Sequence, residues 1–150
     1  MIYWFTGQPG HGKTVLGKLL LSTRGNNTFH IDGDHLREIF ENKDFSESGR
    51  RKNIDIAQKI AHYLNNQGGD VIVSLVSPYL DQREEFKNKI GDSIVEIYVH
   101  TTEERGREHF HVSNYQKPIE NFIDIDTTID TPEESLNKIL SNEKLHSKSR

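Results

Sequence analysis

The sequence predicts an α/β fold, in which a five-stranded, mainly parallel sheet carries helices on both faces. Short apolar runs alternate with amphipathic helical patterns along the chain, and such alternation favours a parallel sheet with right-handed crossovers. Residues 70–75 form a nearly continuous apolar run, which is typical of a strand covered on both faces. A glycine-rich loop at residues 7–14 joins the first apolar run to the first helical pattern.

Each further element follows from the spacing of apolar residues and from the residues that suit its ends. Apolar residues recur at helical spacing from Ile56 to Leu64, and Ser46 suits the N-cap of this long helix. Thr131 and Pro132 suit the cap and first turn of the last helix. The predicted strands cover residues 2–6, 28–31, 70–75, 93–99 and 127–130. The predicted helices cover residues 13–22, 34–41, 46–66, 80–89 and a last segment from Thr131, with a helical turn at 102–108.

The chain is predicted to be a single domain over residues 1–150, because no repeat or linker divides it and this length supports one core. Residues 109–123 show no clean period. A segment of that length without regular structure is expected to be a lid or a binding loop. The polar tail at 142–150 is expected to fray.

Composition limits the class of protein. A net charge of −4 disfavours a nucleic-acid partner, which would favour a basic patch. No apolar run approaches the ~20 residues of a membrane span, and no targeting segment precedes the glycine-rich loop. The chain has no cysteine and eight scattered histidines, of which only His109 and His111 lie close together. A cytoplasmic protein without a membrane partner is therefore expected.

The glycine-rich loop is the clearest functional motif. Its glycines let backbone N–H groups turn inward to form an anion-binding concavity, and the following helix points its positive end at the same place. Lys13 is expected to contact the β- and γ-phosphates of ATP, and the Thr14 hydroxyl to ligate Mg²⁺. A glycine turn that binds nothing is the disfavoured alternative. The expected ATP-binding residues are Gly7, Gln8, Pro9, Gly10, His11, Gly12, Lys13 and Thr14.

Polar residues after the second predicted strand are candidates for an acceptor site, because ligands of parallel sheets bind beyond the carboxyl ends of the strands. Asp34 is placed to steer Mg²⁺ or to accept a hydroxyl proton, and Arg37 lies one turn further on. The alternative is that Asp32 or Asp34 only caps a helix and that Arg37 is solvated.

Two further segments are weaker candidates for the acceptor site. Arg50 and Asn53 share one helix face, and an arginine fork can clamp a phosphate or sulfate. Spacing alone is equally consistent with a charged surface, and Phe45 with a hydrophobic staple. Ser77 and Pro78 follow the third predicted strand, where a turn is the simpler interpretation.

Together these motifs resemble those of the adenylylsulfate kinase family. GQPGHGKT at 7–14, DGDHLR at 32–37, FSESGRRKNI at 45–54, VSPY at 76–79 and VEIYVHTTEER at 95–105 occur in family order. The resemblance implies one P-loop kinase domain that uses ATP and Mg²⁺. It implies transfer of the γ-phosphate to the ribose 3′-hydroxyl of adenosine 5′-phosphosulfate, and it allows for a homodimer.

The resemblance also implies roles for single residues. Lys13 and Asp34 would be catalytic, Thr14 and Asp34 would hold the metal, and Arg105 would lie next to the donor adenine. Phe45 and Phe122 would stack on the two faces of the acceptor adenine. The implied acceptor-binding residues are Asp34, Arg37, Phe45, Arg50, Asn53, Ser77, Pro78 and Phe122.

The lid departs from the family pattern. Where the family usually carries GLYKKARxGxIKxF, residues 109–122 read HFHVSNYQKPIENF, so Phe122 is kept but nearly all basic residues are lost. Lys117 or another residue would have to replace them. Two alternatives stay open: a kinase for another nucleotide, a sugar or a modified-base hydroxyl, and a nucleotide-binding protein without turnover. Asp34, Arg37 and Arg50 argue against the second.

Overall fold

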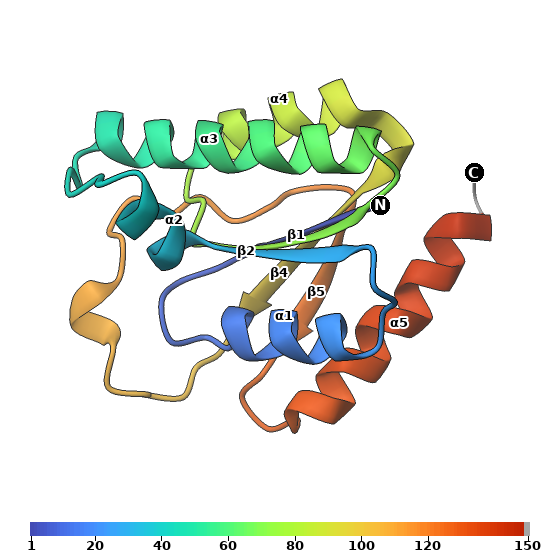
Figure 1. Cartoon of the computed structure of the whole chain (residues 1–150). Coiled ribbons are helices and arrows are strands. Elements are labelled where there is room, and N and C mark those ends of the chain that lie inside the picture. Colours follow the sequence, from blue (N-terminus) through green and yellow to red (C-terminus); the bar gives the residue numbers. More distant parts are fainter. Residues whose placement is uncertain (149–150) are drawn as a thin grey trace.

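A computed structural model describes residues 1–148 of the chain and contains a five-stranded sheet whose strands all pair in parallel (Figure 1). The order of the strands across the sheet is β2-β3-β1-β4-β5, so the α/β architecture that the sequence predicts is confirmed. The strands are β1 (Ile2–Thr6), β2 (Thr28–Asp32), β3 (Asp70–Ser74), β4 (Ile94–His100) and β5 (Phe122–Asp126).

Helices cover both faces of this sheet. In Figure 1, α3 and α4 lie above it, and α1 and α5 lie below it. The helix α2 and the segment between β4 and β5 lie beside the carboxyl ends of the strands. The helices are α1 (Lys13–Ser22), α2 (Gly33–Ile39), α3 (Glu47–Asn66), α4 (Leu80–Ile90) and α5 (Pro132–Lys148), with short 3₁₀ turns η1 (Gly91–Ser93) and η2 (Glu108–Phe110).

The central strand β1 divides the core into two clusters, because successive side chains of a strand point to opposite faces. Ile2 and Trp4 are buried in the cluster under α3 and α4, where Trp4 packs on Phe86. Tyr3 and Phe5 are buried in the second cluster with α1 and α5. Burial on both faces explains why the central strands of the sheet are continuous apolar runs in the sequence.

Side-chain caps fix where the two longest helices begin. The hydroxyl of Ser46 accepts a hydrogen bond from the backbone N–H of Gly49 at 3.3 Å. Thr131 and Glu134 form a reciprocal capping box, in which each side chain accepts from the backbone of the other at 3.2 Å. Both predicted N-caps are therefore confirmed. None of the helices within residues 1–148 is long and apolar enough to cross a membrane.

Two predicted elements are wrong. The last strand does not lie at 127–130 but begins at Phe122, where Ile123 and Ile125 are buried and the alternating Asp124 and Asp126 are exposed. That period-two pattern is typical of an edge strand.

The predicted helical turn at 102–108 is a loop. Gly106 adopts a positive φ of 81°, and the Glu108 carboxylate accepts from the backbone of Arg105 and Gly106. A side chain thus takes the backbone bonds that a helical turn would make.

The polar segment from Asn142 is not a frayed tail as far as the structure describes it, because α5 continues to Lys148. Glu143 accepts from Tyr3 at 2.5 Å and from Arg24 at 2.7 Å, which ties this end of α5 to β1 and to the end of α1. Residues 149–150 of the predicted tail lie outside the described residues.

Candidate active site

The glycine-rich loop runs from the end of β1 to the start of α1 and takes a shape that needs glycine. Gly10 and Gly12 have φ angles of 81° and 107°, which L-residues rarely adopt. A Cβ on Gly7 would lie 2.2 Å from the Val99 carbonyl oxygen. The loop can therefore pack against the end of β4 while it turns its backbone toward the start of α1.

Lys13 is the buried cation of this loop. Its side chain is 8% exposed, and its ammonium group donates to the Gln8 carbonyl at 2.8 Å. Burial lowers the pKa of Lys13 to about 7, while the negative charge of Asp34 opposes that shift. An arriving phosphate would favour the charged form of the lysine.

Two carboxylates lie at the end of β2, and one of them contacts the hydroxyl of Thr14. Asp32 accepts from Thr14 at 3.3 Å with one oxygen, and with the other it caps α2 through the N–H of His35 at 3.1 Å. Asp34 lies in the first turn of α2 and also lines the cavity. The sequence analysis assigned the metal-side carboxylate to Asp34 alone, whereas the contact with Thr14 is made by Asp32.

These groups suit a cation that arrives with its nucleotide. No cluster of three or more histidine, cysteine, aspartate or glutamate side chains forms an all-protein metal site in the part of the chain that the structure describes. Mg²⁺ is commonly held by one or two carboxylates together with substrate phosphates. Thr14, Asp32 and Asp34 are the residues that fit that arrangement.

Arg37 and Phe45 form one wall of the acceptor side. The Arg37 guanidinium donates to the carbonyls of Asn42 and Asp44 at 3.2 and 3.0 Å and lies 4.1 Å from the centre of the Phe45 ring. Burial, and then the positive charge of Arg50, lower the pKa of Arg37. The guanidinium groups of Arg37 and Arg50 therefore lie near each other. The Phe45 ring is 62% exposed, so its exposed face can stack on a ligand.

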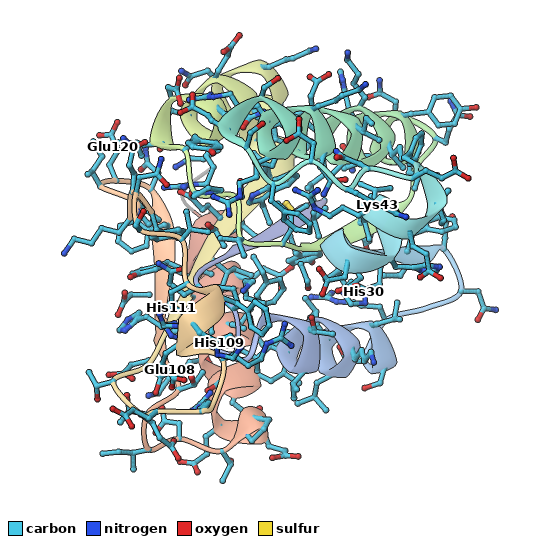
Figure 2. The ribbon with its side chains drawn as sticks, turned by 90° about the vertical axis from the view of Figure 1, so that its left-hand side faces the viewer. His30, Lys43, Glu108, His109, His111 and Glu120 are labelled. Carbon is cyan, nitrogen blue, oxygen red and sulfur yellow. The ribbon has the colours of Figure 1, made fainter. Side chains whose placement is uncertain are left out.

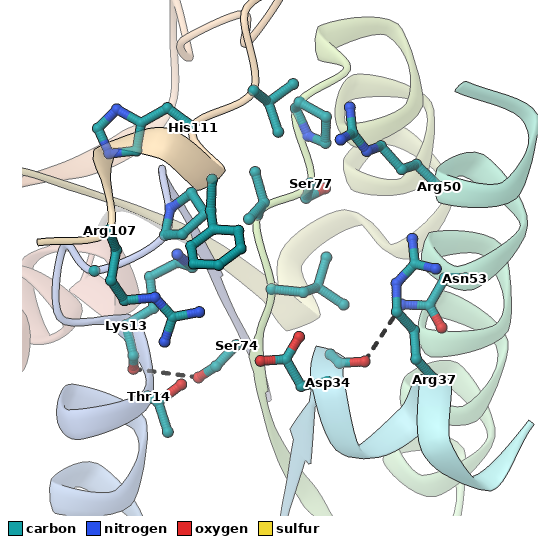
Figure 3. A pocket seen from close by; sticks show the side chains of 18 of the residues that line it. Lys13, Thr14, Asp34, Arg37, Arg50, Asn53, Ser74, Ser77, Arg107 and His111 are labelled. Atoms are coloured by element: carbon teal, nitrogen blue, oxygen red, sulfur yellow. Dashed lines mark hydrogen bonds between the residues drawn. The ribbon is translucent and has the colours of Figure 1, made fainter. Parts of the chain in front are cut away.

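Arg50 and Asn53 line the cavity from α3 (Figure 3). Each of these side chains has polar atoms without a hydrogen-bond partner among the described residues. Among the described residues, the Arg50 guanidinium has no hydrogen-bond or ion-pair partner. Asn53 is 5% exposed, and its amide donates weakly to the Gly33 carbonyl at 3.5 Å, but its side-chain oxygen has no partner there. Buried polar atoms normally have partners, so this oxygen is suited to a ligand hydroxyl.

Gly49 allows a close contact between the start of α3 and the loop before it. A Cβ on Gly49 would lie 2.2 Å from the Asp44 carbonyl oxygen, so only glycine lets the loop before α3 approach the helix. Asn42 donates to the Gly49 carbonyl at 3.0 Å. This close contact helps to place Phe45 and Arg37 at the cavity.

Ser77 and Pro78 line the cavity beyond the end of β3, and Arg83 holds this turn from behind. Ser77 has an unusual positive φ of 46°, and its carbonyl accepts from the Arg83 guanidinium at 2.5 Å. Arg83 is 2% exposed, pairs with the buried Glu96 at 2.8 Å and also donates to the Gln116 carbonyl. Arg83 therefore supports the turn and does not line the cavity.

The lid, residues 107–121, closes over the phosphate loop. The Gln8 amide group exchanges two hydrogen bonds of 2.8 Å with the backbone of Val112. His11 meets His111 edge to face with ring centres 5.1 Å apart, and burial lowers the pKa of His11 to about 4. The His11 ring is therefore packed against the lid and is only partly exposed. Glu108, His109 and His111 lie together on the lid (Figure 2).

The cavity under the lid has a volume of about 510 Å³. It brings together most of the residues predicted from the sequence, which come from the phosphate loop, α2, the loop before α3, α3 and the turn after β3. The predicted residues that line it are Pro9, Gly10, Lys13, Thr14, Asp34, Arg37, Phe45, Arg50, Asn53, Ser77 and Pro78.

Phe122 is not brought to this cavity. It begins β5 at the amino end of the sheet edge, where its ring meets that of Tyr98 with centres 6.3 Å apart. The expectation that Phe122 stacks on an acceptor base is therefore wrong, since the ligands of a parallel sheet bind at the opposite ends of the strands. Arg105 lies beside the phosphate loop and donates to the carbonyls of Gly10 and Thr127, outside the cavity.

The sequence analysis missed the lid residues that do line the cavity. These residues lie just before, or at the start of, the segment that has lost the family's basic motif. Their place in the sequence was the only feature that could have predicted a role in the cavity. They are Arg107, His109, Phe110, His111 and Val112. Lys117, named as a replacement for the lost cations, is exposed and is not among the lining residues.

Comparison with known proteins agrees with this geometry. The family model described as Adenylylsulphate kinase matches residues 1–139. The chain belongs to the adenylylsulfate kinase family. It is thus a kinase, a P-loop phosphotransferase of an ATP-using family.

Its relatives in this family and fold differ in their acceptors. A cytidine diphosphoramidate kinase of Campylobacter jejuni is 33% identical over 145 residues, covering 90% of this chain and 83% of that protein. The Mycobacterium tuberculosis APS kinase in complex with AMPPNP and APS is 21% identical with a TM-score of 0.77, covering 95% and 96% of the two chains. A gluconokinase from Sinorhizobium meliloti is 15% identical with a TM-score of 0.67, covering 99% and 97%. The two structural likenesses concern the fold alone.

Proposed function

We propose that the protein transfers the γ-phosphate of MgATP to a ribose hydroxyl of a nucleoside whose 5′ position carries a phosphate-linked anionic group. One observation carries the proposal: the buried Lys13 and the partner-free guanidinium of Arg50 line the same cavity from two sides (Figure 3). Lys13 would hold the donor phosphates, and Arg50 would clamp the anionic group of the acceptor. The free oxygen of Asn53 would accept from a sugar hydroxyl.

Within this class we favour cytidine diphosphoramidate as the acceptor. The Campylobacter relative that is named for this substrate is 33% identical to the chain. The second aromatic ring expected for an adenine sandwich, that of Phe122, lies away from the cavity. Adenosine 5′-phosphosulfate is the second candidate, and the family model that matches residues 1–139 supports it.

The residues would act by position and charge instead of covalent catalysis. The phosphate loop and Lys13 would hold the donor, and Asp34 would accept the proton that the attacking hydroxyl loses. Mg²⁺ bound with the nucleotide would be held at Thr14 with Asp32 or Asp34, and it would offset charge on the phosphates. Arg37 and Phe45 would orient the acceptor base and its anionic group.

An ADP-release assay with one acceptor at a time tests the proposal. The acceptors are cytidine diphosphoramidate, adenosine 5′-phosphosulfate and gluconate, with an acceptor-free control. We expect ADP release above the control with cytidine diphosphoramidate. Turnover with adenosine 5′-phosphosulfate alone would support the second candidate. Turnover with gluconate alone, or tight ATP binding without any turnover, would overturn the proposal in favour of a sugar kinase or a non-catalytic nucleotide-binding protein.

Replacement of Asp34 tests its role in the transfer. We expect Asp34→Asn to lower kcat by at least about 10²-fold, because the amide cannot accept the hydroxyl proton, while ATP binding measured by calorimetry persists. The matched control is Asp55→Asn on α3, where Asp55 makes only a surface ion pair with Lys59. Near-normal turnover in Asp34→Asn would remove Asp34 from the catalytic role.

A further inference from the structure

The lid lacks the cations that its family usually carries there, and the structure offers a specific replacement. Residues 109–122 contain one lysine, Lys117, and no arginine, and Lys117 does not line the cavity. The lysine and arginine side chains that line the described cavity are Lys13, Arg37, Arg50 and Arg107. Arg107 alone of these four reaches the cavity from the lid.

Arg107 packs directly on the phosphate loop. Its Cβ would lie 3.2 Å from a Cβ built on Gly10, so the loop and the first residue of the lid are in van der Waals contact. Figure 3 shows the Arg107 side chain reaching into the cavity beside Lys13 and Thr14. Two hydrogen bonds between Gln8 and Val112 hold the lid in this place. Arg107 thus lies on the donor side of the cavity, opposite Arg50.

The guanidinium of Arg107 has no anionic or hydrogen-bonded partner among the described residues, and its one close contact is the Phe110 ring, with the centre 5.5 Å away. Figure 3 shows Arg107 beside Lys13 in the cavity, so two basic side chains lie near each other. Arg105, two residues earlier, differs because it donates to the Thr127 carbonyl at 2.6 Å and to Glu103. Two basic side chains that line the same part of a cavity suit a phosphate between them.

We propose that Arg107 replaces the lost lid cations and stabilises the phosphoryl group while it is transferred, an inference that rests on the proposed kinase function. In that step the bond between the γ-phosphorus and the β,γ-bridging oxygen breaks, and its electron pair leaves on ADP. A bond forms from the acceptor hydroxyl oxygen to the phosphorus, and the hydroxyl proton passes to Asp34. Arg107 donates hydrogen bonds to the phosphoryl oxygens and exchanges no proton.

Steady-state kinetics of Arg107→Ala test this role. We expect kcat to fall about 10²–10³-fold, with little change in the KM for either substrate, and methylguanidinium added to the assay to restore part of the rate. Lys117→Ala is the matched control from the same lid and is expected to behave as the wild type. Unchanged kcat, or a raised KM for ATP with normal kcat, would overturn the inference. Arg107 is exposed, so its truncation is expected to leave the melting temperature unchanged.

A binding measurement separates this inference from the identity of the acceptor. We expect wild-type protein to bind ADP with aluminium fluoride, a mimic of the transferred phosphoryl group, more tightly than ADP alone. Arg107→Ala should lose that gain and keep its affinity for ADP. If no acceptor supports turnover of the wild type, the proposed function fails while this measurement still decides the role of Arg107. Equal affinities of wild type and variant for the aluminium fluoride complex would overturn it.

Discussion

The phosphate loop and the lid face each other across one cavity, but they are held in different ways. The loop depends on its own glycines, with the positive φ angles of Gly10 and Gly12, and on its attachment to β1 and α1. The lid contains only one 3₁₀ turn, Glu108–Phe110, as regular structure, and distant residues hold it. Gln8 binds it at Val112, and Arg83 binds it at Gln116.

Because of this difference, we expect the phosphate loop and the lid to respond differently to mutation. A loop fixed by local backbone geometry keeps its shape as long as its own residues are kept. A lid fixed by side chains far away in the sequence can be released by a change at a residue outside the lid. Arg83 and Gln8 are the residues through which this contrast can be tested.

The largest effect is expected from Arg83→Met, which removes the buried support of both the lid and the Ser77 turn. It leaves Glu96, 1% exposed, with Lys87 as its remaining partner at 2.8 Å. Removing one partner of a buried ion pair commonly costs about 3–5 kcal/mol. We therefore expect the free energy of unfolding, measured by urea denaturation, to fall by about 3 kcal/mol.

Arg51→Met is the control for this experiment. Arg51 pairs at the surface with Glu47 and Asp81, and its guanidinium lies 4.2 Å from the centre of the Tyr79 ring, so its replacement should cost less than about 2 kcal/mol. The double variant Arg83→Met, Glu96→Met should recover part of the loss, since it leaves no unpaired charge of the original pair. Equal stabilities of Arg83→Met and Arg51→Met would show that the buried pair does not hold the lid.

A smaller effect is expected from Gln8→Leu, which removes both bonds to Val112 and keeps the fold. Two hydrogen bonds of about 1 kcal/mol each correspond to a 10–30-fold change in the opening of the lid. We expect kcat/KM to fall by about that factor and hydrogen exchange at the Val112 amide to accelerate. Gln67→Leu, at an exposed residue after α3, is the control. Slow exchange at Val112 in Gln8→Leu would mean that other contacts hold the lid.

The effect of pH on ATP binding belongs to the phosphate loop, and for one pH unit it is the smallest of the three. The pKa of Lys13 is lowered to about 7 in the free protein, whereas bound phosphates favour its protonated form. Above pH 7 the free lysine is therefore neutral and must take up a proton when ATP binds. We expect ATP affinity to fall by up to about tenfold per pH unit between pH 7 and 9, as measured by calorimetry in buffers of different ionisation enthalpy.

The control for this pH dependence is Lys13→Met, in which both the slope and the proton uptake should disappear. Lys18→Met, on the exposed face of α1, should keep both. An affinity of the wild type that is the same at pH 7 and pH 9 would contradict the shifted pKa of Lys13.

Sequence reasoning succeeded where the signal is local. The glycine-rich loop, the alternation of strands and helices, and the caps at Ser46 and Thr131 involve residues within a few positions of one another, so spacing is enough to identify them. The misplaced last strand had a local signal too, because the alternation of Phe122–Asp126 is typical of an edge strand. The predicted lid, 109–123, includes the first two residues of this strand. The resemblance, and not a local pattern, implied a site role for Phe122.

By itself, the sequence determined the α/β class, the phosphate loop and the set of polar residues at the strand ends, because strand and helix periods and glycine geometry are properties of short segments. Only the tertiary structure decided that Asp32 contacts Thr14, that Arg83 is a buried support, and that Arg107 enters the cavity while Lys117 does not. These facts depend on contacts between side chains that are far apart in the sequence, and the pattern of a short segment does not predict such contacts.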